Sequence, residues 1–268
     1  MHIIYYTFFL YLMYTSAKKT TSLLYHIARP NIATLNIAKM NMMKPNVNLI
    51  SISPAGFKGF YLMGIASYIK THFSLENYIY SGASAGSWTA LLMTYNREDL
   101  SAITNKILDK RVENTKSIKA LEYTIKEQIL TNFKKEDFDL HKLFIGVTTI
   151  DKFKINTPIY SNFASLEDAI DCCIASSHIP FITGSIMNKY HDIYSFDGGF
   201  SKYPYLNNII PTLHMTPDIF SNKTIKQMPS IAEYSAMFSR DRYNFRELFD
   251  AGYTDAKNNH YFLDRTII

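Results

Sequence analysis

The sequence predicts an α/β protein with a mainly parallel central sheet, and three observations support this fold class. Short apolar runs alternate along the chain with segments whose apolar residues follow helical spacing. Loops rich in glycine or serine follow the first two apolar runs and the last one. The 268 residues, 47% of them hydrophobic and 19% charged, have the composition of a globular chain long enough for one sizeable core.

The expected elements begin at residue 47 and alternate between strand and helix, which is why the sheet is expected to be parallel and covered. Strands are expected where apolar residues form short uninterrupted runs, and helices where they recur every three or four positions. Residues 98–142 interleave acidic and basic side chains at helical spacing, which is typical of a solvated helical face. In chain order we expect a strand at 47–52, a helix at 60–72, a strand at 78–80, a helix ending near residue 95, the charged helical region, a strand at 143–150, a helix at 166–175 and a strand at 193–196.

Residues 1–46 form an extension whose role the sequence leaves open. Its apolar run, residues 3–14, has the length of a signal-peptide core, but no Lys or Arg precedes it. The run is too short to span a bilayer, which takes roughly 20 residues. The extension is therefore a signal or anchor, another targeting segment, or the result of a start site set too early, since Met40, Met42 and Met43 stand just before the first strand.

The net charge of +5 belongs to this N-terminal part of the chain. Residues 1–50 hold five basic and no acidic residues, whereas residues 51–268 hold 23 of each. The folded part is thus close to neutral, and charge gives no support for a nucleic-acid partner. Its glycines match neither a P-loop nor a dinucleotide-binding fingerprint.

The two cysteines, Cys172 and Cys173, are neighbours in the sequence, which makes an ordinary disulfide between them unfavourable. We expect both to be buried small hydrophobic residues on a helix. No Cys and His residues stand at the spacing of a zinc site, and the sequence predicts neither a metal nor an organic cofactor.

The strongest chemical signal is a G-x-S-x-G motif placed between a predicted strand and a predicted helix. This arrangement makes a sharp turn that exposes the serine hydroxyl, while small neighbours let the backbone pass closely. The helix that follows favours negative charge developing near the serine. The motif consists of Gly82, Ala83, Ser84, Ala85 and Gly86.

Two further segments supply what a serine nucleophile requires, a proton acceptor and an oxyanion hole. The loop at 53–59 directly follows the first strand and offers flexible backbone amides. Asp197 follows the last strand and precedes Gly198 and Gly199, so its carboxylate is expected at the same sheet edge as Ser84. Asp-Gly alone is common in turns, and only the combination of the three segments favours a catalytic site.

In this order the segments resemble the patatin-like phospholipase family, and most closely its adiponutrin-type lipid acyl hydrolases. The likeness is good over about residues 47–210 and weak elsewhere. The matching segments are 53–64 (oxyanion loop), 80–86 (nucleophile elbow), 175–184 (Ala-Ser-x-x-Ile-Pro-Phe), 196–200 (catalytic aspartate) and, more weakly, 247–256 (a closing helix).

The resemblance implies a three-layer α/β fold and a Ser–Asp dyad that needs no histidine. On that basis Ser84 is the nucleophile and Asp197 accepts its proton and later returns it to the leaving alcohol. Lys58 stands where many members have a basic residue, and it is a candidate for attracting a lipid phosphate. The residues at the oxyanion positions are Gly56, Phe57, Lys58 and Gly59.

One departure from the family concerns the oxyanion loop, where three glycines are usual and this chain has Pro54-Ala55-Gly56. Proline has no amide hydrogen, and the loss of one oxyanion donor costs roughly 100- to 1000-fold in rate. A catalytically weak lipid-binding protein on the same fold is therefore one alternative.

The other alternative is a Ser-His-Asp esterase. Its chain order would be Ser84, Asp197 and then His214 or His260. His178, inside the Ser-x-x-Ile-Pro segment, is expected to line the site or pack rather than act as a base.

The resulting prediction has three parts: an extension at 1–46, a catalytic domain at 47–210 and a helical, aromatic extension at 211–268 packed on it. The expected reaction is hydrolysis of a lipid ester through an acyl-serine, with phospholipid favoured over neutral glyceride. The expected partner is a lipid surface, for which the aromatic residues of 194–262 are candidates. A cytoplasmic or membrane-associated location is favoured, with secretion only if residues 1–17 act as a signal peptide; the oligomeric state is left open.

Overall fold

The structure, a computed structural model, describes residues 47–151, 154–185, 187–200, 206, 209–221 and 243–267. The predictions made for residues 1–46 lie outside these described residues. The fold class is α/β with a mainly parallel sheet, as predicted. None of the helices in the described ranges is long and apolar enough to cross a membrane.

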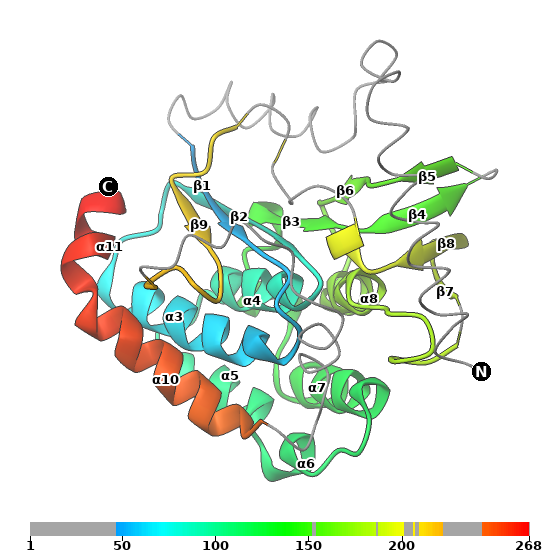
Figure 1. Ribbon diagram of the computed structural model, residues 1–268, viewed down its shortest axis with the longest axis horizontal. Helices are drawn as coiled ribbons and strands as arrows, with labels where there is room; N and C mark the ends of the chain where they lie inside the picture. Colours follow the sequence, from blue (N-terminus) through cyan, green and yellow to red (C-terminus); the bar gives the residue numbers. More distant parts are fainter. Residues whose placement is uncertain are drawn as a thin grey trace. The chain divides into compact units, whose positions relative to one another are not determined.

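The central sheet has five strands in the order β6-β3-β2-β1-β9 (Figure 1). The four strands β3, β2, β1 and β9 are parallel, and only the edge strand β6 runs antiparallel. Its strands are β1 (Asn48–Ile52), β2 (Tyr78–Ala83), β3 (Leu143–Gly146), β6 (Ile159–Tyr160) and β9 (Leu213–Met215).

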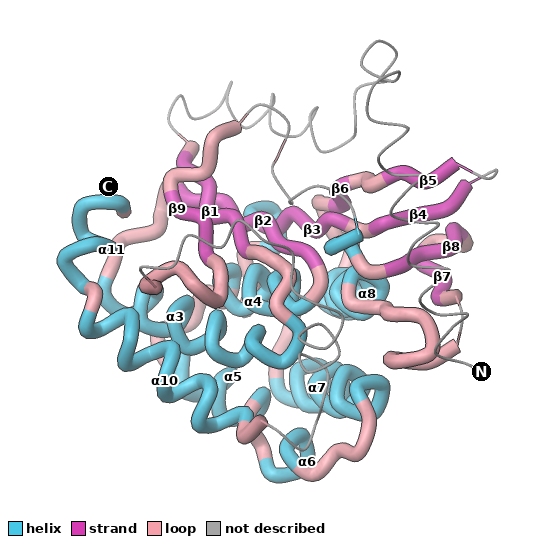
Figure 2. Tube along the Cα trace, in the orientation of Figure 1, coloured by secondary structure: helices cyan, strands magenta, loops and turns pink. Residues whose placement is uncertain are grey.

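Apolar clusters lie on both faces of this sheet, which explains why neighbouring residues of one strand are both hydrophobic instead of alternating with polar ones. In β1, Ile50 packs into the large core cluster on the helical side, whereas Leu49 belongs to a second cluster on the other face. The helices that cover the first face include α3 (Gly59–His72), α4 (Ala85–Thr94) and α8 (Leu166–Ser176), with α4 lying across three strands (Figure 2).

The charged region predicted at 98–142 is helical, as expected. Each of its α-helices begins at a side-chain cap that satisfies an amide of the first turn, which is why the chain starts helices at these points. They are α5 (Leu100–Ile107, capped by Asp99), α6 (Lys110–Glu113, capped by Asp109) and α7 (Ile118–Asn132, capped by Ser117).

The apolar run predicted as one strand at 143–150 forms two strands in different sheets. The chain leaves the central sheet at Val147, and β4 (Thr148–Asp151) then joins a separate antiparallel sheet in the order β5-β4-β8-β7. This second sheet also contains β5 (Lys154–Asn156), β7 (Asn188–Tyr190) and β8 (Ile193–Phe196). The strand before Asp197 is therefore β8 of the second sheet. The expectation that Asp197 follows a strand of the same sheet as Ser84 was wrong.

The chain beyond residue 210 contributes β9 to the central sheet and two helices, α10 (Phe245–Asn258) and α11 (His260–Thr266). Helix α10 crosses α3 closely at two glycines. A Cβ at Gly64 would lie 2.0 Å from the Phe249 carbonyl oxygen, and one at Gly252 would lie 2.0 Å from that of Tyr61. The C-terminal helix is thus packed on the core, while the domain boundaries at 46 and 210 stay predictions.

Candidate active site

Ser84 occupies a strained turn between β2 and α4. Its φ of 53° and ψ of −134° are rare for a residue with a side chain. The two motif glycines allow the chain to pass closely: a Cβ at Gly82 would lie 2.2 Å from the Gly86 carbonyl oxygen, and one at Gly86 would lie 2.5 Å from that of Ile52. The local sequence therefore has the geometry predicted for a nucleophile elbow.

Asp197 lies directly against this serine although it comes from the other sheet. The Ser84 hydroxyl donates to Asp197 Oδ2 at 2.5 Å, and the Gly199 amide donates to Oδ1 at 2.6 Å. Thr148 of β4 fixes the backbone by donating to the Asp197 carbonyl oxygen at 2.8 Å. Both members of the predicted dyad are buried, with exposed fractions of 4% for Ser84 and 5% for Asp197.

The surroundings of Asp197 suit a base that works near neutral pH. Burial raises the pKa of this carboxyl from 3.8 to about 7, and the hydrogen bonds from Ser84 and Gly199 oppose the rise only in part. A general base is most effective when its pKa lies near the working pH.

The predicted oxyanion loop forms a 3-10 turn, Gly56–Lys58, in which Gly56 has a φ of 54°. The turn lies against the start of α4, because a Cβ at Gly59 would be 2.7 Å from the Ala85 Cβ. The loop and the turn at Ser84 are therefore neighbours.

The turn itself uses two of the four predicted donor amides. The Lys58 amide donates to the Ala55 carbonyl oxygen at 3.1 Å, and the Gly59 amide donates to the carbonyl oxygens of the two residues at the start of the turn. Of the predicted set, Gly56 and Phe57 remain as candidates. Ala85 adds a further amide, because the first residues of a helix have no intrahelical acceptor.

Pro54 lies beside the dyad rather than far along the loop. A Cβ at Gly199 would be 3.0 Å from Pro54 Cγ and 2.8 Å from Asp197 Oδ1. The proline ring, Gly199 and the carboxylate are therefore close together, and the proline ring fills space beside Asp197.

The two histidines of the triad alternative lie elsewhere in the fold. His214 of β9 pairs with Ser51 of the neighbouring strand β1. Ser51 in turn pairs with Ser81 of β2, so His214 lies two strands away from the strand that leads to Ser84. Burial lowers the pKa of His214. His260 bonds through Nδ1 to the Tyr68 hydroxyl at 3.0 Å.

His178 is close to the site but its ring is occupied by its own loop. Nε2 lies 3.1 Å from the Ser185 carbonyl oxygen, and because a carbonyl only accepts, Nε2 carries the proton. Nδ1 lies 3.0 Å from the Thr183 hydroxyl. These contacts match the expectation that His178 packs at the site instead of acting as its base.

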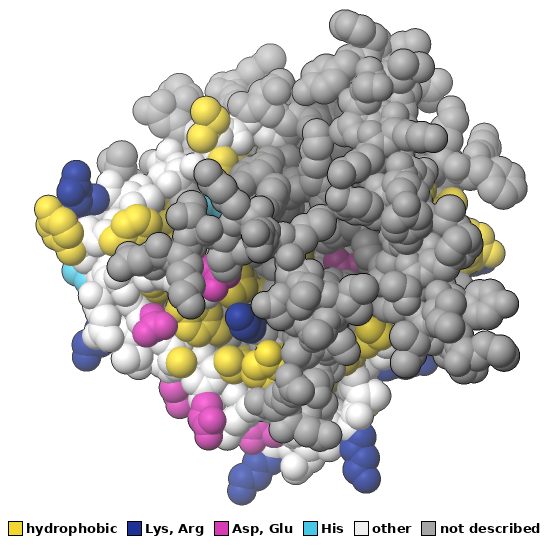
Figure 3. Space-filling view, in the orientation of Figure 1, with side chains coloured by type: hydrophobic (Ala, Val, Ile, Leu, Met, Phe, Trp, Pro, Cys, Tyr) yellow, Lys and Arg dark blue, Asp and Glu magenta, His cyan; other side chains and the backbone are white. Residues whose placement is uncertain are grey.

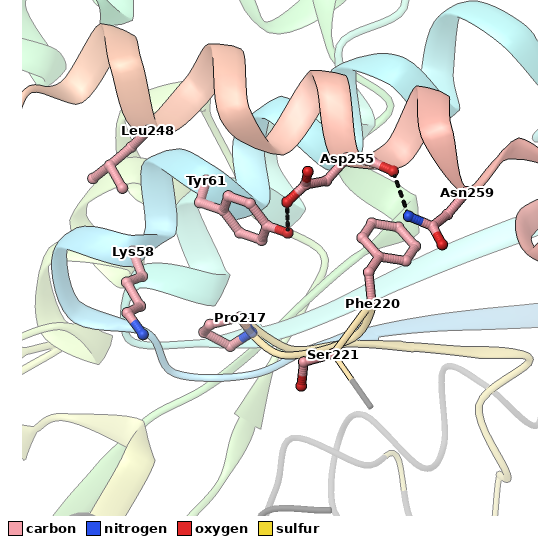
Figure 4. Close-up of a pocket in the computed structure, with 8 residues that line it drawn as sticks. All are labelled: Lys58, Tyr61, Pro217, Phe220, Ser221, Leu248, Asp255 and Asn259. Carbon is pink, nitrogen blue, oxygen red and sulfur yellow. Dashed lines mark hydrogen bonds between the residues drawn. The ribbon is translucent and has the colours of Figure 1, made fainter. Parts of the chain in front are cut away.

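A hollow of about 390 Å³ adjoins the outer side of the oxyanion turn (Figure 4), within the size range of small-molecule sites. In it the Tyr61 hydroxyl donates to Asp255 Oδ2 at 2.8 Å. Figure 3 shows hydrophobic side chains with acidic and basic ones among them over this part of α3 and α10. The lining residues are Lys58, Tyr61, Pro217, Phe220, Ser221, Leu248, Asp255 and Asn259.

The part of the chain that the structure describes contains no group of three or more His, Cys, Asp or Glu residues that could hold a metal ion. Cys172 and Cys173 are both free and buried on α8, as predicted. Burial raises the pKa of both thiols, which keeps them unreactive.

Sequence reasoning missed three residues that contact the site or its supports: Ser176, Ser177 and Glu122. The two serines lie in the 175–184 segment, where the motif could be recognised but no contact could be assigned. Glu122 was included in the solvated helical face, but only 5% of it is exposed, so that expectation was wrong for this residue. Its spacing of four from Ile118 and three from Ile125 was the available signal.

A family model described as patatin-like phospholipase matches residues 50–209, more than half of the chain, and this range includes Ser84 and Asp197. None of the curated proteins matches the chain.

Proposed function

Because the chain belongs to the patatin-like phospholipase family, we propose that it hydrolyses lipid esters with Ser84 as the nucleophile and Asp197 as the only general base. The observation that carries the proposal is the 2.5 Å hydrogen bond from the Ser84 hydroxyl to Asp197 Oδ2 inside a buried site. A nucleophile and its base at hydrogen-bond distance are the signature of an activated serine.

In the proposed first half-reaction, the Ser84 oxygen attacks the ester carbonyl carbon while its proton moves to Asp197. The amides of Gly56, Phe57 and Ala85 would stabilise the oxyanion of the tetrahedral intermediate. When the intermediate collapses, Asp197 gives the proton to the leaving alcohol and an acyl-serine remains.

In the second half-reaction, water attacks the acyl-serine with Asp197 again as base. The water proton passes to Asp197 and then to the Ser84 oxygen as the fatty acid leaves, which restores the starting state. The positive φ of Ser84 supports this role, since it places the hydroxyl at the sharp turn between β2 and α4, where it reaches Asp197.

The proposed substrate class is a phospholipid, with neutral glyceride second. The hollow beside the oxyanion turn supports a lipid in general, because its lining combines apolar side chains with Lys58 and Asp255. We further propose that the protein acts at a lipid surface, since a phospholipid substrate is part of such a surface.

The test is fatty-acid release from a panel of phospholipids and glycerides. Ser84→Ala and Asp197→Asn are each expected to lower kcat by about a thousandfold or more. His214→Ala and His260→Ala serve as controls and are expected to keep wild-type rates, because the Ser84 hydroxyl bonds to Asp197 and not to either ring. Equal release by wild type and Ser84→Ala would contradict the proposal, and lipid binding without release would favour the non-catalytic alternative.

A further inference from the structure

Two residues support the two members of the dyad: Ser176, the last residue of α8, and His178, two positions after it. The Ser84 amide donates to Ser176 Oγ at 2.8 Å, and Ser176 Oγ donates to the Gly146 carbonyl oxygen at 2.7 Å. The Asp197 amide donates to the His178 carbonyl oxygen at 2.8 Å. The backbones of nucleophile and base are thus fixed by residues only two positions apart.

Ser177, between these two residues, is the centre of a buried hydrogen-bond network. Its hydroxyl oxygen lies 3.1 Å from Trp88 Nε1, 2.7 Å from the Cys173 carbonyl oxygen and 2.7 Å from Glu122 Oε1. Ser177, Cys173, Trp88 and Glu122 are all buried. The network joins α4, α7 and α8 just behind the dyad.

Counting protons in this network assigns the protonation state of Glu122. Ser177 has one hydroxyl proton, the Cys173 carbonyl can only accept, and the indole of Trp88 can only donate. The contacts of the Ser177 oxygen to Cys173 and to Glu122, both 2.7 Å, each need a proton between two oxygens, and Ser177 supplies only one. Both contacts are satisfied when the Glu122 carboxyl group supplies the second proton. Glu122 is therefore a neutral carboxylic acid in this arrangement.

The surroundings of Glu122 agree with that assignment. The pKa of Glu122 is raised to about 8, mainly by burial and also by the charge of Asp197, while the bond to Ser177 opposes the rise. Cys173, the other titratable group beside it, has a thiol pKa raised by burial. One turn further along α7, the ammonium of Lys126 is already bonded to acidic side chains of α8.

We propose that Ser176, Ser177 and His178 form a platform that positions the Ser84–Asp197 dyad, and that Glu122 holds this platform in place only as a neutral acid. Loss of the Glu122 proton leaves the single Ser177 hydroxyl proton for two acceptors at 2.7 Å, the Glu122 carboxylate and the Cys173 carbonyl oxygen, so one of the two contacts is broken. The platform then shifts, and activity falls on the alkaline side. This inference rests on the proposed function, because it assigns positioning residues to that reaction.

Trp88 gives a readout that does not depend on catalysis, since it is the only tryptophan of the chain. Its fluorescence, excited where tyrosine does not absorb, is measured from about pH 6 to 10 in the wild type, in Glu122→Gln and in Glu127→Gln. The wild type should show a transition near pH 8, close to the pKa of Glu122. Glu122→Gln should show none, because its amide donates to Ser177 at every pH, and the exposed Glu127 variant should behave as wild type.

Kinetics give the second readout. Glu122→Gln should retain most of kcat at about pH 7 and lose the alkaline fall, whereas Glu122→Leu and Ser176→Ala should lower kcat by about 10- to 100-fold with KM little changed. Thermal unfolding of each variant verifies that it is folded. If Glu122→Leu does not fold, the comparison of Glu122→Gln with wild type still tests the inference.

A wild-type fluorescence that stays flat between about pH 7 and 9.5, or an unchanged transition in Glu122→Gln, would overturn the assignment of Glu122. Equal kcat in Ser176→Ala and wild type would overturn the positioning role. A wild type that shows the transition but releases no fatty acid would contradict the proposed function and still support the network.

Discussion

The ionisation of Asp197 should make the protein less stable as the pH rises, and this effect can be isolated with one substitution. The pKa of Asp197 is about 7 in the fold, whereas an unperturbed aspartate has a pKa of 3.8. Between these values the folded state binds more protons than the unfolded chain, so the free energy of unfolding falls with pH. The contribution is full below about pH 4 and is lost as the pH passes about 7.

The magnitude follows from the same shift. A difference of about 3 pKa units corresponds to about 4 kcal/mol, since one unit is about 1.4 kcal/mol. Asp197→Asn keeps the shape of the side chain but cannot ionise. The variant should therefore exceed the wild type in stability by up to about 4 kcal/mol at about pH 8, while the two should be similar at about pH 4.

The assay is urea unfolding of wild type and Asp197→Asn at about pH 4 and pH 8. Ser84→Ala is the matched comparison, because it removes a donor to the charged carboxylate and should lower stability only at the higher pH. A loss of stability in Asp197→Asn that is equal at both pH values would refute the reasoning that burial of this charge is costly.

Three further predictions concern the rate, the loop and the helix crossing. The value of kcat/KM should rise about tenfold per pH unit below pH 7, as Asp197 loses its proton, before the alkaline fall that we assign to Glu122; the absence of this rise would exclude Asp197 as the base. Pro54→Gly should leave kcat/KM within about tenfold of wild type, because the proposed donors begin at Gly56, and a rise of about a hundredfold would make residue 54 a donor position. Gly64→Ala should destabilise the fold by about 1–3 kcal/mol or more in urea unfolding, because the new Cβ meets the Phe249 carbonyl; wild-type stability would mean that α10 does not pack there.

The nucleophile elbow could be predicted because its constraints are local. The positive φ of Ser84 and the close approaches at Gly82 and Gly86 follow from a five-residue pattern between a strand and a helix. The pairing with Asp197 could be expected from the order of the motifs, since each motif follows a strand.

The route by which Asp197 reaches the serine could not be predicted. The segment 143–150 contains no proline and no charged residue that would end a strand, and only the pairing of β4 with β8 shows that the chain changes sheets at Val147. Such pairing is set by partners distant in sequence, which a local pattern does not contain.

The burial of Glu122 is a second feature that the sequence did not predict. In sequence Glu122 is one charged residue among many on a helix, and its charge predicts exposure. In the fold it is buried, bonds to Ser177 and has a raised pKa, and these features depend on Ser177 and Asp197, which lie far away along the chain.

The central claim, that Ser84 is a nucleophile activated by Asp197, is tested most directly by covalent trapping. The folded protein is treated with a fluorophosphonate, and the modified peptide is identified by mass spectrometry in wild type, Ser84→Ala and Asp197→Asn. The account predicts a single adduct on Ser84 in the wild type, none in Ser84→Ala and much slower labelling in Asp197→Asn. An adduct on a different residue, or labelling of Asp197→Asn at the wild-type rate, would contradict it.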